Sequence, residues 1–235
     1  MFITKLVYRK TIEGNHAKDA LSMALYNKPT NQIKHPILIA RDSMAPFGDK
    51  TGYLFIVRGC NSGCLYCSAP VHTPGKLYTP LSEIQRVLNE YKKQGVDVVS
   101  IMDDNLFIDE EYTLRAIELL AEQNLKWMAF NVRGDYLIGK VKKLTQSGLV
   151  GAYLGVESVS DETLKEYKKR ETTNQINQAI KELKYHGCYV WGNYIFCMPN
   201  ATLDGSKKEI EQLASPGTRP CYAYHLYTIS RNSPF

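Results

Sequence analysis

The chain alternates strand-like and helix-like segments from about residue 50 to its end, and this alternation constrains the fold more than any other feature. Six apolar runs have the length and composition of buried strands, and they cover residues 52–57, 96–102, 127–132, 150–156, 189–196 and 222–229. Apolar strands that alternate with helices favour a parallel sheet with helices outside it. Right-handed crossovers would curl six such units, so we expect an α/β fold: a partial (β/α)6 barrel with parallel strands and outer helices.

Residues typical of helix ends support this division. Thr79 and Pro80 suit the N-cap and first turn of a helix that Gly95 ends, and Asp109 and Ser160 suit the N-caps of two more. Apolar residues at helical spacing predict further helices over residues 136–144, 173–187 and 206–213.

Residues 1–50 do not show this alternation of strand-like and helix-like segments. We therefore expect a small N-terminal extension or cap over residues 1–50 and a core barrel over residues 51–235. An apolar fraction of 44% can supply a sizeable core. No run of about 18 apolar residues occurs, so no membrane partner is expected. The net charge of +5 is modest, and the densest basic run, residues 168–170, suits a solvated helix end better than a nucleic-acid contact.

Polar or sulfur-bearing residues follow five consecutive predicted strands where each strand ends. They are Cys60, Cys64, Cys67, Asp103, Asp104, Asn105, Asn131, Arg133, Glu157, Ser158, Cys197 and Met198. Ligands of parallel α/β folds bind at the carboxyl ends of the strands, so the sequence predicts one site at this rim. Simpler explanations exist for two pairs, since Asp104 with Asn105 and Glu157 with Ser158 could cap the segments that follow.

Three of these residues, Cys60, Cys64 and Cys67, lie within eight positions directly after the first strand. Thiolates so close in sequence can converge on one soft metal centre, and iron–sulfur clusters are held by such ligands. A 4Fe-4S cluster has four irons, so three thiolates leave one iron free to bind a reacting molecule. Structural zinc usually needs four ligands. The candidates for a fourth ligand are His72, Cys188, Cys197 and Cys221.

The order of these motifs resembles that of the radical SAM superfamily, and within it the branch with cobalamin-binding and methylthio-transferring members. There the first strand ends in Arg-Gly-Cys, the second in Asp-Asp-Asn, the fourth in Gly-x-Glu-Ser and the fifth in Gly-x-x-x-Gly-x-Pro. This chain has Arg58-Gly59-Cys60, Asp103-Asp104-Asn105, Gly155-Val156-Glu157-Ser158 and, over residues 192–199, Gly-Asn-Tyr-Ile-Phe-Cys-Met-Pro. The resemblance extends over about residues 52–235.

The resemblance implies two cofactors, a 4Fe-4S cluster and S-adenosylmethionine (SAM). The three cysteines would ligate the cluster, whose open iron chelates the amino and carboxylate groups of SAM. Tyr66 sits where the family places an aromatic residue beside the adenine, and Ile195 and Met198 would line the same base. An apolar slot of this kind suits a purine.

Polar residues of the rim would hold the rest of the cofactor. The run Asp103-Asp104-Asn105 occupies the place where the family fixes the SAM amino group or the substrate. Arg133 is a candidate for the methionine carboxylate, and Glu157 for amino or ribose groups, with Asn131 and Ser158 beside them. Arg133 could instead pair structurally with Asp135 or Glu157.

Two departures from the branch are informative. The fifty residues before the first strand are too few for a cobalamin-binding domain of the usual size, which argues against cobalamin-dependent methyl transfer. In addition, Cys197 replaces the usual glycine at the end of the fifth strand. Its thiol could act catalytically by donating a hydrogen atom to a substrate radical, or it could pack as a small apolar side chain.

The sequence thus predicts a radical SAM enzyme. An external one-electron reductant of the flavodoxin or ferredoxin type would drive reductive cleavage of SAM to a 5′-deoxyadenosyl radical. This radical would abstract hydrogen from a peptide or small natural-product substrate, leading to epimerisation, rearrangement or carbon–carbon bond formation. A partner protein could complete the mouth of the barrel, and free thiols with an oxygen-sensitive cluster indicate a cytoplasmic location. The alternative is an iron–sulfur electron-transfer module or a non-catalytic partner module.

Overall fold

The strands of the computed structural model form one curved sheet. The structure describes residues 35–40, 47–73, 75–196, 198, 202–214 and 224–228, and in these ranges the sheet has the order β1-β2-β5-β6-β7-β8-β9. Its strands are β1 (Ile39–Ala40), β2 (Thr51–Leu54), β5 (Val98–Ile101), β6 (Lys126–Val132), β7 (Leu149–Glu157), β8 (Tyr189–Phe196) and β9 (Tyr224–Thr228). Within this sheet the neighbours β2, β5, β6, β7, β8 and β9 are parallel, and β1 pairs antiparallel with β2.

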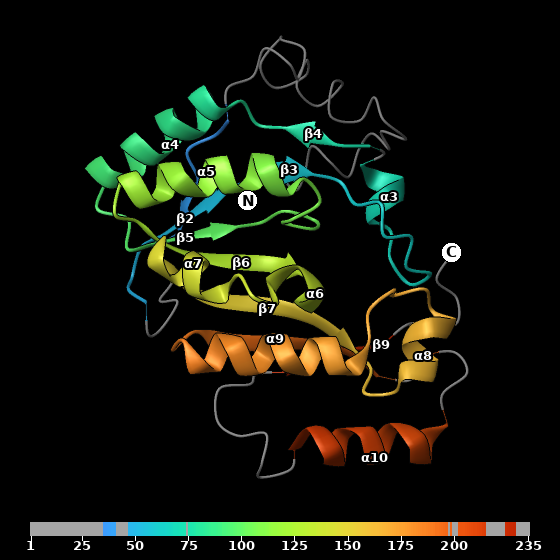
Figure 1. Cartoon of the computed structure of the whole chain (residues 1–235). Coiled ribbons are helices and arrows are strands. Elements are labelled where there is room, and N and C mark those ends of the chain that lie inside the picture. Colours follow the sequence, from blue (N-terminus) through green and yellow to red (C-terminus); the bar gives the residue numbers. More distant parts are fainter. Residues whose placement is uncertain are drawn as a thin grey trace.

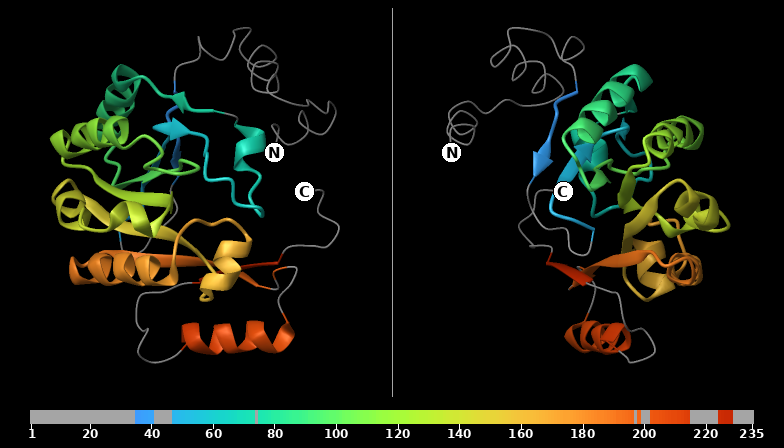
Figure 2. Two further views of the ribbon diagram at one scale, coloured as in Figure 1. Left: turned by 45° about the vertical axis from the view of Figure 1, so that its right-hand side comes forward. Right: turned by 90° about the vertical axis from the view of Figure 1, so that its left-hand side faces the viewer.

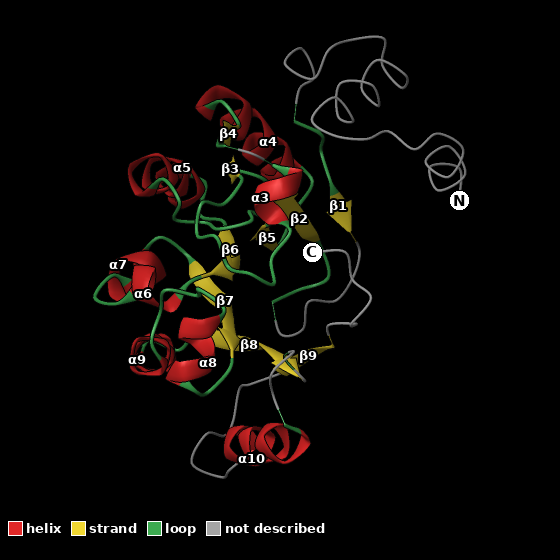
Figure 3. Ribbon diagram, turned by 90° about the vertical axis from the view of Figure 1, so that its right-hand side faces the viewer, coloured by secondary structure: helices red, strands yellow, loops and turns green. Residues whose placement is uncertain are grey.

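Helices cover the convex side of the sheet, as Figure 1 and Figure 3 show. They are α4 (Leu81–Lys93), α5 (Glu110–Glu122), α6 (Gly134–Leu137), α7 (Val141–Gln146), α8 (Asp161–Glu166), α9 (Thr173–Tyr185) and α10 (Leu203–Ala214). Both views of Figure 2 place α10 beyond the β8–β9 end of the sheet. The prediction of an α/β partial barrel with parallel strands and outer helices is confirmed. No helix among the described residues is both long and apolar enough to cross a bilayer.

The main core lies between the helices and the convex face of the sheet. Helix α4 contributes Ile84, Val87, Leu88 and Tyr91, which are buried and share one face because they recur at three- and four-residue intervals. Burying one large aliphatic side chain contributes about 1.5–3 kcal/mol to stability. The concave face of the sheet is left for the site.

The first predicted strand is shorter than the apolar run that predicts it. Strand β2 ends at Leu54, and β3 (Val57–Arg58) pairs antiparallel with β4 (Leu77–Tyr78) outside the main sheet. The cause is Asp103, whose carboxylate oxygens accept hydrogen bonds from the backbone N–H groups of Ile56 and Val57 at 2.8 and 2.9 Å. Since these N–H groups do not bond to the sheet, the chain leaves it and enters the cysteine loop.

Two predictions about helices are wrong. The single helix over residues 136–144 is divided into α6 and α7, because Gly139 has a φ of +75° and its N–H donates to Glu182 Oε2 at 2.8 Å. The N-cap of α4 is Pro80 instead of Thr79. The backbone N–H of Thr79 is held by the carbonyl of Ile56 at 3.0 Å.

Other helix ends follow the prediction. Asp109 accepts from the backbone N–H of Tyr112 at the start of α5, and Ser160 accepts from Thr163 at the start of α8. Helix α9 begins at Thr173, as expected, after a capping box formed by Thr172 and Gln175.

The described part of the N-terminal extension is attached to the core. The backbone N–H of Leu38, before β1, donates to the hydroxyl oxygen of Tyr91 at 3.3 Å, and this hydroxyl donates to the carbonyl of Tyr53 at 2.6 Å. His35 Nε2 accepts from the backbone N–H of Phe55 at 3.1 Å. The division of the chain at residue 50 stays a prediction, since residues 1–34 and 41–46 lie outside the described residues.

Candidate cluster and cofactor site

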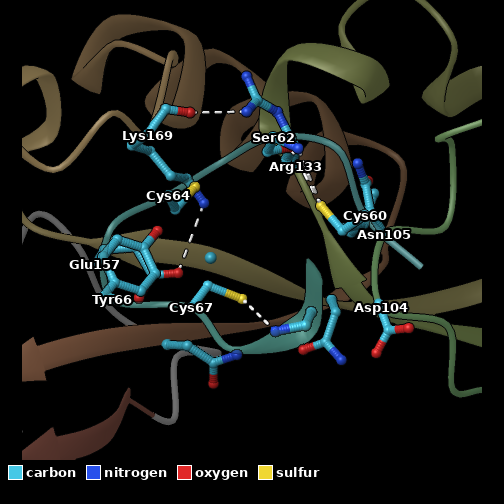
Figure 4. Close-up of a pocket in the computed structure, with 15 residues that line it drawn as sticks. Cys60, Ser62, Cys64, Tyr66, Cys67, Asp104, Asn105, Arg133, Glu157 and Lys169 are labelled. Carbon is cyan, nitrogen blue, oxygen red and sulfur yellow. Dashed lines mark hydrogen bonds and ion pairs between the residues drawn. The ribbon is translucent and has the colours of Figure 1, made fainter. Parts of the chain in front are cut away.

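The cysteine loop connects β3 to α3 (Ala69–His72) and its three thiols line one pocket of about 220 Å³ (Figure 4). The loop needs glycine at position 59, where φ is +104° and a Cβ atom would lie 2.0 Å from the carbonyl oxygen of Gly75. It is also tied to the far side of the site, because the N–H of Leu65 donates to the carbonyl of Tyr167 at 3.0 Å.

The donor set fits a cluster better than a single ion. Among the described residues, no three His, Cys, Asp or Glu side chains are placed to hold one metal ion, although three thiols line the same pocket. In an iron–sulfur cluster each thiolate ligates an iron of the cluster, so the sulfur atoms need not meet at one point. Backbone N–H groups already point at two of the sulfurs, from Ser62 to Cys60 and from Ala69 to Cys67. Burial raises the pKa of the Cys67 thiol when no metal is bound.

The adjacent acids Asp103 and Asp104 have different surroundings. Asp104 lines the pocket and its Oδ2 accepts from the N–H of Gly59 at 2.7 Å and from Arg58 Nε at 3.3 Å. Asp103 is fully buried behind the loop, where both of its oxygens bind backbone N–H groups, and it does not line the pocket. Burial raises the pKa of Asp103 to about 7, against the effect of these hydrogen bonds. Its position supports a role in shaping the loop, not in contacting SAM as predicted.

Two asparagines present amide atoms without partners to the pocket. Asn105 is 2% exposed, and neither its oxygen nor its nitrogen has a hydrogen-bond partner within the described part of the chain. The same holds for Oδ1 of Asn193 on β8. Buried amides normally satisfy their hydrogen-bonding groups, so both side chains suit a polar ligand. Asn131 also lines the pocket, with a φ of +50° and its Nδ2 3.3 Å from the carbonyl of Asp103.

A buried lysine with two carboxylates forms one wall of the pocket. Lys169 Nζ lies 3.6 Å from Glu157 Oε1 and 3.6 Å from Glu171 Oε2 (Figure 4 shows the first pair). Lys169 is 5% exposed, so the expectation of a solvated basic run at residues 168–170 is wrong at this position. Burial raises the pKa of Glu157, and Lys169 opposes that shift. The sequence analysis predicted neither Lys169 nor Asn193 as a site residue. Lys169 lies in a run of basic residues and Asn193 lies inside a strand, and neither local pattern indicates a binding site.

Arg133 lines the pocket, but most of its N–H groups already have acceptors. Its Nε and Nη2 bind Asp135 at 3.0 and 2.6 Å, and its Nη1 and Nη2 donate to the carbonyls of Lys169 and Arg170 at 2.7 and 2.6 Å. The guanidinium therefore holds the segment that carries Lys169. This is the structural pairing with Asp135 that the sequence left open for it.

The predicted adenine contacts are divided between two places. Tyr66 lines the cysteine pocket, and burial, with Glu157 beside it, raises its pKa well above the ordinary value so that the phenol stays neutral. Ile195 and Met198 pack with Tyr66 and Tyr167 in one apolar cluster, but they line a separate pocket of about 240 Å³ next to α10.

Ser158 and Cys197 are the remaining predicted residues. The Ser158 hydroxyl donates to Glu209 Oε1 at 2.8 Å and accepts from the N–H of Ser160 at 3.1 Å, so it lies behind the pocket and not in its lining. Glu209 also accepts from the hydroxyl of Tyr194. Cys197 lies outside the described residues, so its proposed hydrogen-donor role stays a prediction.

Comparison with known proteins identifies the family. The family model described as the Radical SAM superfamily matches residues 54–212, which is more than half of the chain. The chain belongs to the radical SAM superfamily. The predictions of a radical SAM enzyme and of a 4Fe-4S cluster and SAM as its cofactors are thereby confirmed.

Individual relatives agree with this assignment. Cytidylyl-2-hydroxyethylphosphonate methyltransferase of Streptomyces wedmorensis is 25% identical over 72% of this chain and 33% of its own length. Hopanoid C-3 methylase of Methylococcus capsulatus is 28% identical over 59% of this chain and 27% of its own length. The structure of the radical S-adenosylmethionine methyltransferase TsrM of Kitasatospora setae, with cobalamin and a [4Fe-4S] cluster bound, has a TM-score of 0.65 at 12% identity. It covers 74% of this chain and 36% of that chain. The chain thus spans about a third of the length of these proteins, and the last comparison concerns the fold alone.

Proposed function

We propose that Cys60, Cys64 and Cys67 hold a 4Fe-4S cluster that, with SAM, supplies a 5′-deoxyadenosyl radical for hydrogen abstraction from a small-molecule or peptide substrate. The observation that carries the proposal is the placement around one pocket of the three thiols, the Glu157–Lys169 pair and the Asn105 amide, which has no hydrogen-bond partner among the described residues. Cysteine thiolates are the ligands that iron–sulfur clusters use. An external one-electron reductant of the flavodoxin or ferredoxin type completes the system.

Charges of both signs in the pocket suit the amino acid end of SAM. Lys169 is the cation that we assign to the carboxylate, because its N–H groups have no partner closer than 3.6 Å among the described residues. Arg133, the sequence-based candidate, binds Asp135 and two carbonyls and supports Lys169 from behind. We assign Glu157 to the amino group of SAM. Its carboxylate is buried with Lys169 as the neighbouring cation, and a second cation would further stabilise the buried negative charge.

Polar and aromatic groups complete the binding of the cofactor. Asn105 can donate or accept, and Oδ1 of Asn193 can accept, without giving up a bond within the described chain. The neutral Tyr66 ring forms an apolar wall backed by Tyr167 and suits the adenine. The same walls exclude water from the place where a radical would form.

Methyl transfer is a second candidate outcome, alongside epimerisation, rearrangement or carbon–carbon bond formation. The relatives that favour it are a methyltransferase and a methylase by name. The argument against cobalamin-dependent transfer used the length of the segment before the first strand. That length decides nothing when the chain spans about a third of these relatives.

One anaerobic assay tests the proposal and separates the outcomes. The cluster is reconstituted and reduced with dithionite, SAM is added, and 5′-deoxyadenosine and S-adenosylhomocysteine are measured by mass spectrometry. We expect 5′-deoxyadenosine from the parent chain and none from Cys64→Ala. The matched control is Cys188→Ala, because this cysteine is buried outside the pocket. A reduced cluster that yields neither product, with an EPR spectrum unchanged by SAM, would favour the electron-transfer or partner module instead.

A further inference from the structure

Three aromatic rings from three neighbouring strands form a stack on the sheet. The Phe130 ring on β6 and the Tyr153 ring on β7 have centroids 4.1 Å apart and planes inclined by 18°. The Tyr153 ring and the Trp191 ring on β8 have centroids 4.7 Å apart and planes inclined by 8°. These separations approach the spacing of about 4.8 Å between strands. The rings therefore stand on the sheet with their edges directed away from it, and we call Phe130, Tyr153 and Trp191 the aromatic ladder.

The aromatic ladder lies on the concave face and is only partly buried. Ala129, Ala152 and Val190 alternate with the three rings along the same strands, belong to the core on the convex face, and are at most 1% exposed. The ladder rings keep intermediate exposure although they are far larger. Tyr153 and Trp191 also pack against the buried ring of Phe47, whose centroid lies 6.2 Å from that of Trp191. The exposure that the three rings keep leaves the ladder an open side beside Phe47.

The aromatic ladder continues directly into the cysteine pocket. Gly155 and Asn193 line that pocket, and they follow Tyr153 and Trp191 by two residues, which places them on the same face of the sheet. Glycine at position 155 leaves room for the charged pair of the pocket at the end of the ladder, since a Cβ atom there would lie 2.5 Å from both Glu157 Oε1 and Lys169 Nζ. A molecule on the ladder would therefore reach the place where the radical is formed.

Polar atoms without partners border the aromatic ladder on the same face. One is Oδ1 of Asn193, and another is Oγ of Ser100 on β5, which is fully buried and has no hydrogen-bond partner among the described residues. Ser100 lies between Val99 and Ile101, which pack into the convex core, so it points to the concave side. In the strand register it pairs with Met128, two residues before Phe130. The face thus offers ring edges together with hydrogen-bonding groups.

We propose that the substrate of this chain carries a planar aromatic or heteroaromatic ring with polar substituents, bound over the aromatic ladder. The inference rests on the proposed function and names the substrate class of that same site. Ring edges carry partial positive charge and ring faces partial negative charge, so the face of a flat aromatic ring packs well against the ladder edges. A saturated ring of the same size lacks this face and would gain only apolar contact.

Binding of a matched pair of probes tests this proposal. The probes are 2-naphthoate and its saturated counterpart decahydro-2-naphthoate, measured by equilibrium dialysis against the full chain with its cluster and SAM. Edge-to-face contacts are worth up to about tenfold each in affinity, so we expect 2-naphthoate to bind about tenfold more tightly than the saturated acid. Equal binding of the two probes would overturn the proposal.

Variants locate the binding on the aromatic ladder. Trp191→Leu should weaken 2-naphthoate binding about tenfold, whereas Trp191→Phe, which keeps a ring, should stay within about threefold of the parent. The matched control is Trp127→Phe, because this second tryptophan of the chain is fully buried on the convex side. Unchanged binding in Trp191→Leu, or an equal loss in Trp191→Leu and Trp191→Phe, would contradict the assignment to the ladder.

The two proposals fail in distinguishable ways. Formation of 5′-deoxyadenosine by the parent chain, measured without any probe, reports on SAM cleavage alone. Preference for the aromatic probe without SAM cleavage would support the ladder and contradict the proposed function. SAM cleavage without that preference would retain the proposed function and overturn the substrate class.

Discussion

The ammonium nitrogen of Lys169 lies 3.6 Å from Oε1 of Glu157, in a wall of the pocket that the three cysteines share. This separation is longer than the 2.7–2.9 Å or so of a charge-assisted hydrogen bond. The pair is therefore close enough for each charge to offset the burial of the other, yet neither is fully bonded. Such a pair can bind the carboxylate and amino groups of a zwitterionic ligand without first breaking a short hydrogen bond between its own members.

Replacement of Lys169 by methionine should weaken SAM binding. A hydrogen bond to a charged group contributes about 1.5–3 kcal/mol, so we expect the dissociation constant to rise about 10- to 100-fold. Calorimetric titration of SAM into the reconstituted chain measures it. Lys168→Met is the matched control, since the neighbouring lysine is exposed, and a similar loss in both variants would refute the assignment of Lys169 to the carboxylate.

Two glycines of the cysteine loop should respond differently to alanine. Gly59 and Gly63 both have positive φ, of +104° and +71°. A Cβ on Gly59 would collide with the carbonyl of Gly75, whereas a Cβ on Gly63 meets nothing within 4 Å. Gly59→Ala should abolish cluster assembly, while Gly63→Ala should retain it and cost about 1–2 kcal/mol of backbone strain. Iron and sulfide content per chain measures both, and equal cluster content in the two variants would contradict this reasoning.

Asp103→Asn should destabilise the chain without removing a pocket side chain. The carboxylate accepts from two backbone N–H groups, and an amide would turn an NH₂ group toward one of them. We expect the free energy of unfolding to fall by about 1–3 kcal/mol. Urea unfolding of the chain before cluster assembly measures it. An unfolding free energy equal to that of the parent would show that these two hydrogen bonds do not hold the loop.

His35 should make stability depend on pH. Burial lowers its pKa below the ordinary value of 6.5, so below that pH the unfolded chain binds a proton that the folded chain resists. The free energy of unfolding should therefore decrease as the pH falls through 6.5, with loss of the bond from the N–H of Phe55. Urea midpoints at pH 7.5 and 5.5 test this, and His35→Gln should reduce the difference. An identical difference in parent and variant would exclude His35 as its source.

The cysteine loop and the strand ends were accessible from the sequence because their signals are local. Three closely spaced thiols predict a shared centre whatever the rest of the chain does, and parallel strands bring their carboxyl ends to one rim by geometry alone. Asp104, Asn105, Asn131, Arg133 and Glu157 accordingly line the same pocket as the cysteines. The sequence pattern does not tell which of the adjacent acids Asp103 and Asp104 faces the pocket. The prediction therefore included Asp103 among the pocket residues, whereas its side chain binds the backbone of the loop.

Tertiary packing decided the rest. Lys169 belongs to a basic run whose sequence predicts an exposed position. Its charge can be buried because the carboxylates of Glu157 and Glu171 lie beside it, and their positions depend on the tertiary structure. Phe130, Tyr153 and Trp191 are distant in sequence and become one stack only because β6, β7 and β8 are neighbours in the sheet. Local spacing by itself determined the cluster loop and the α/β architecture. The charged pair of the pocket and the stack of rings depend on contacts between distant segments, which no local pattern encodes.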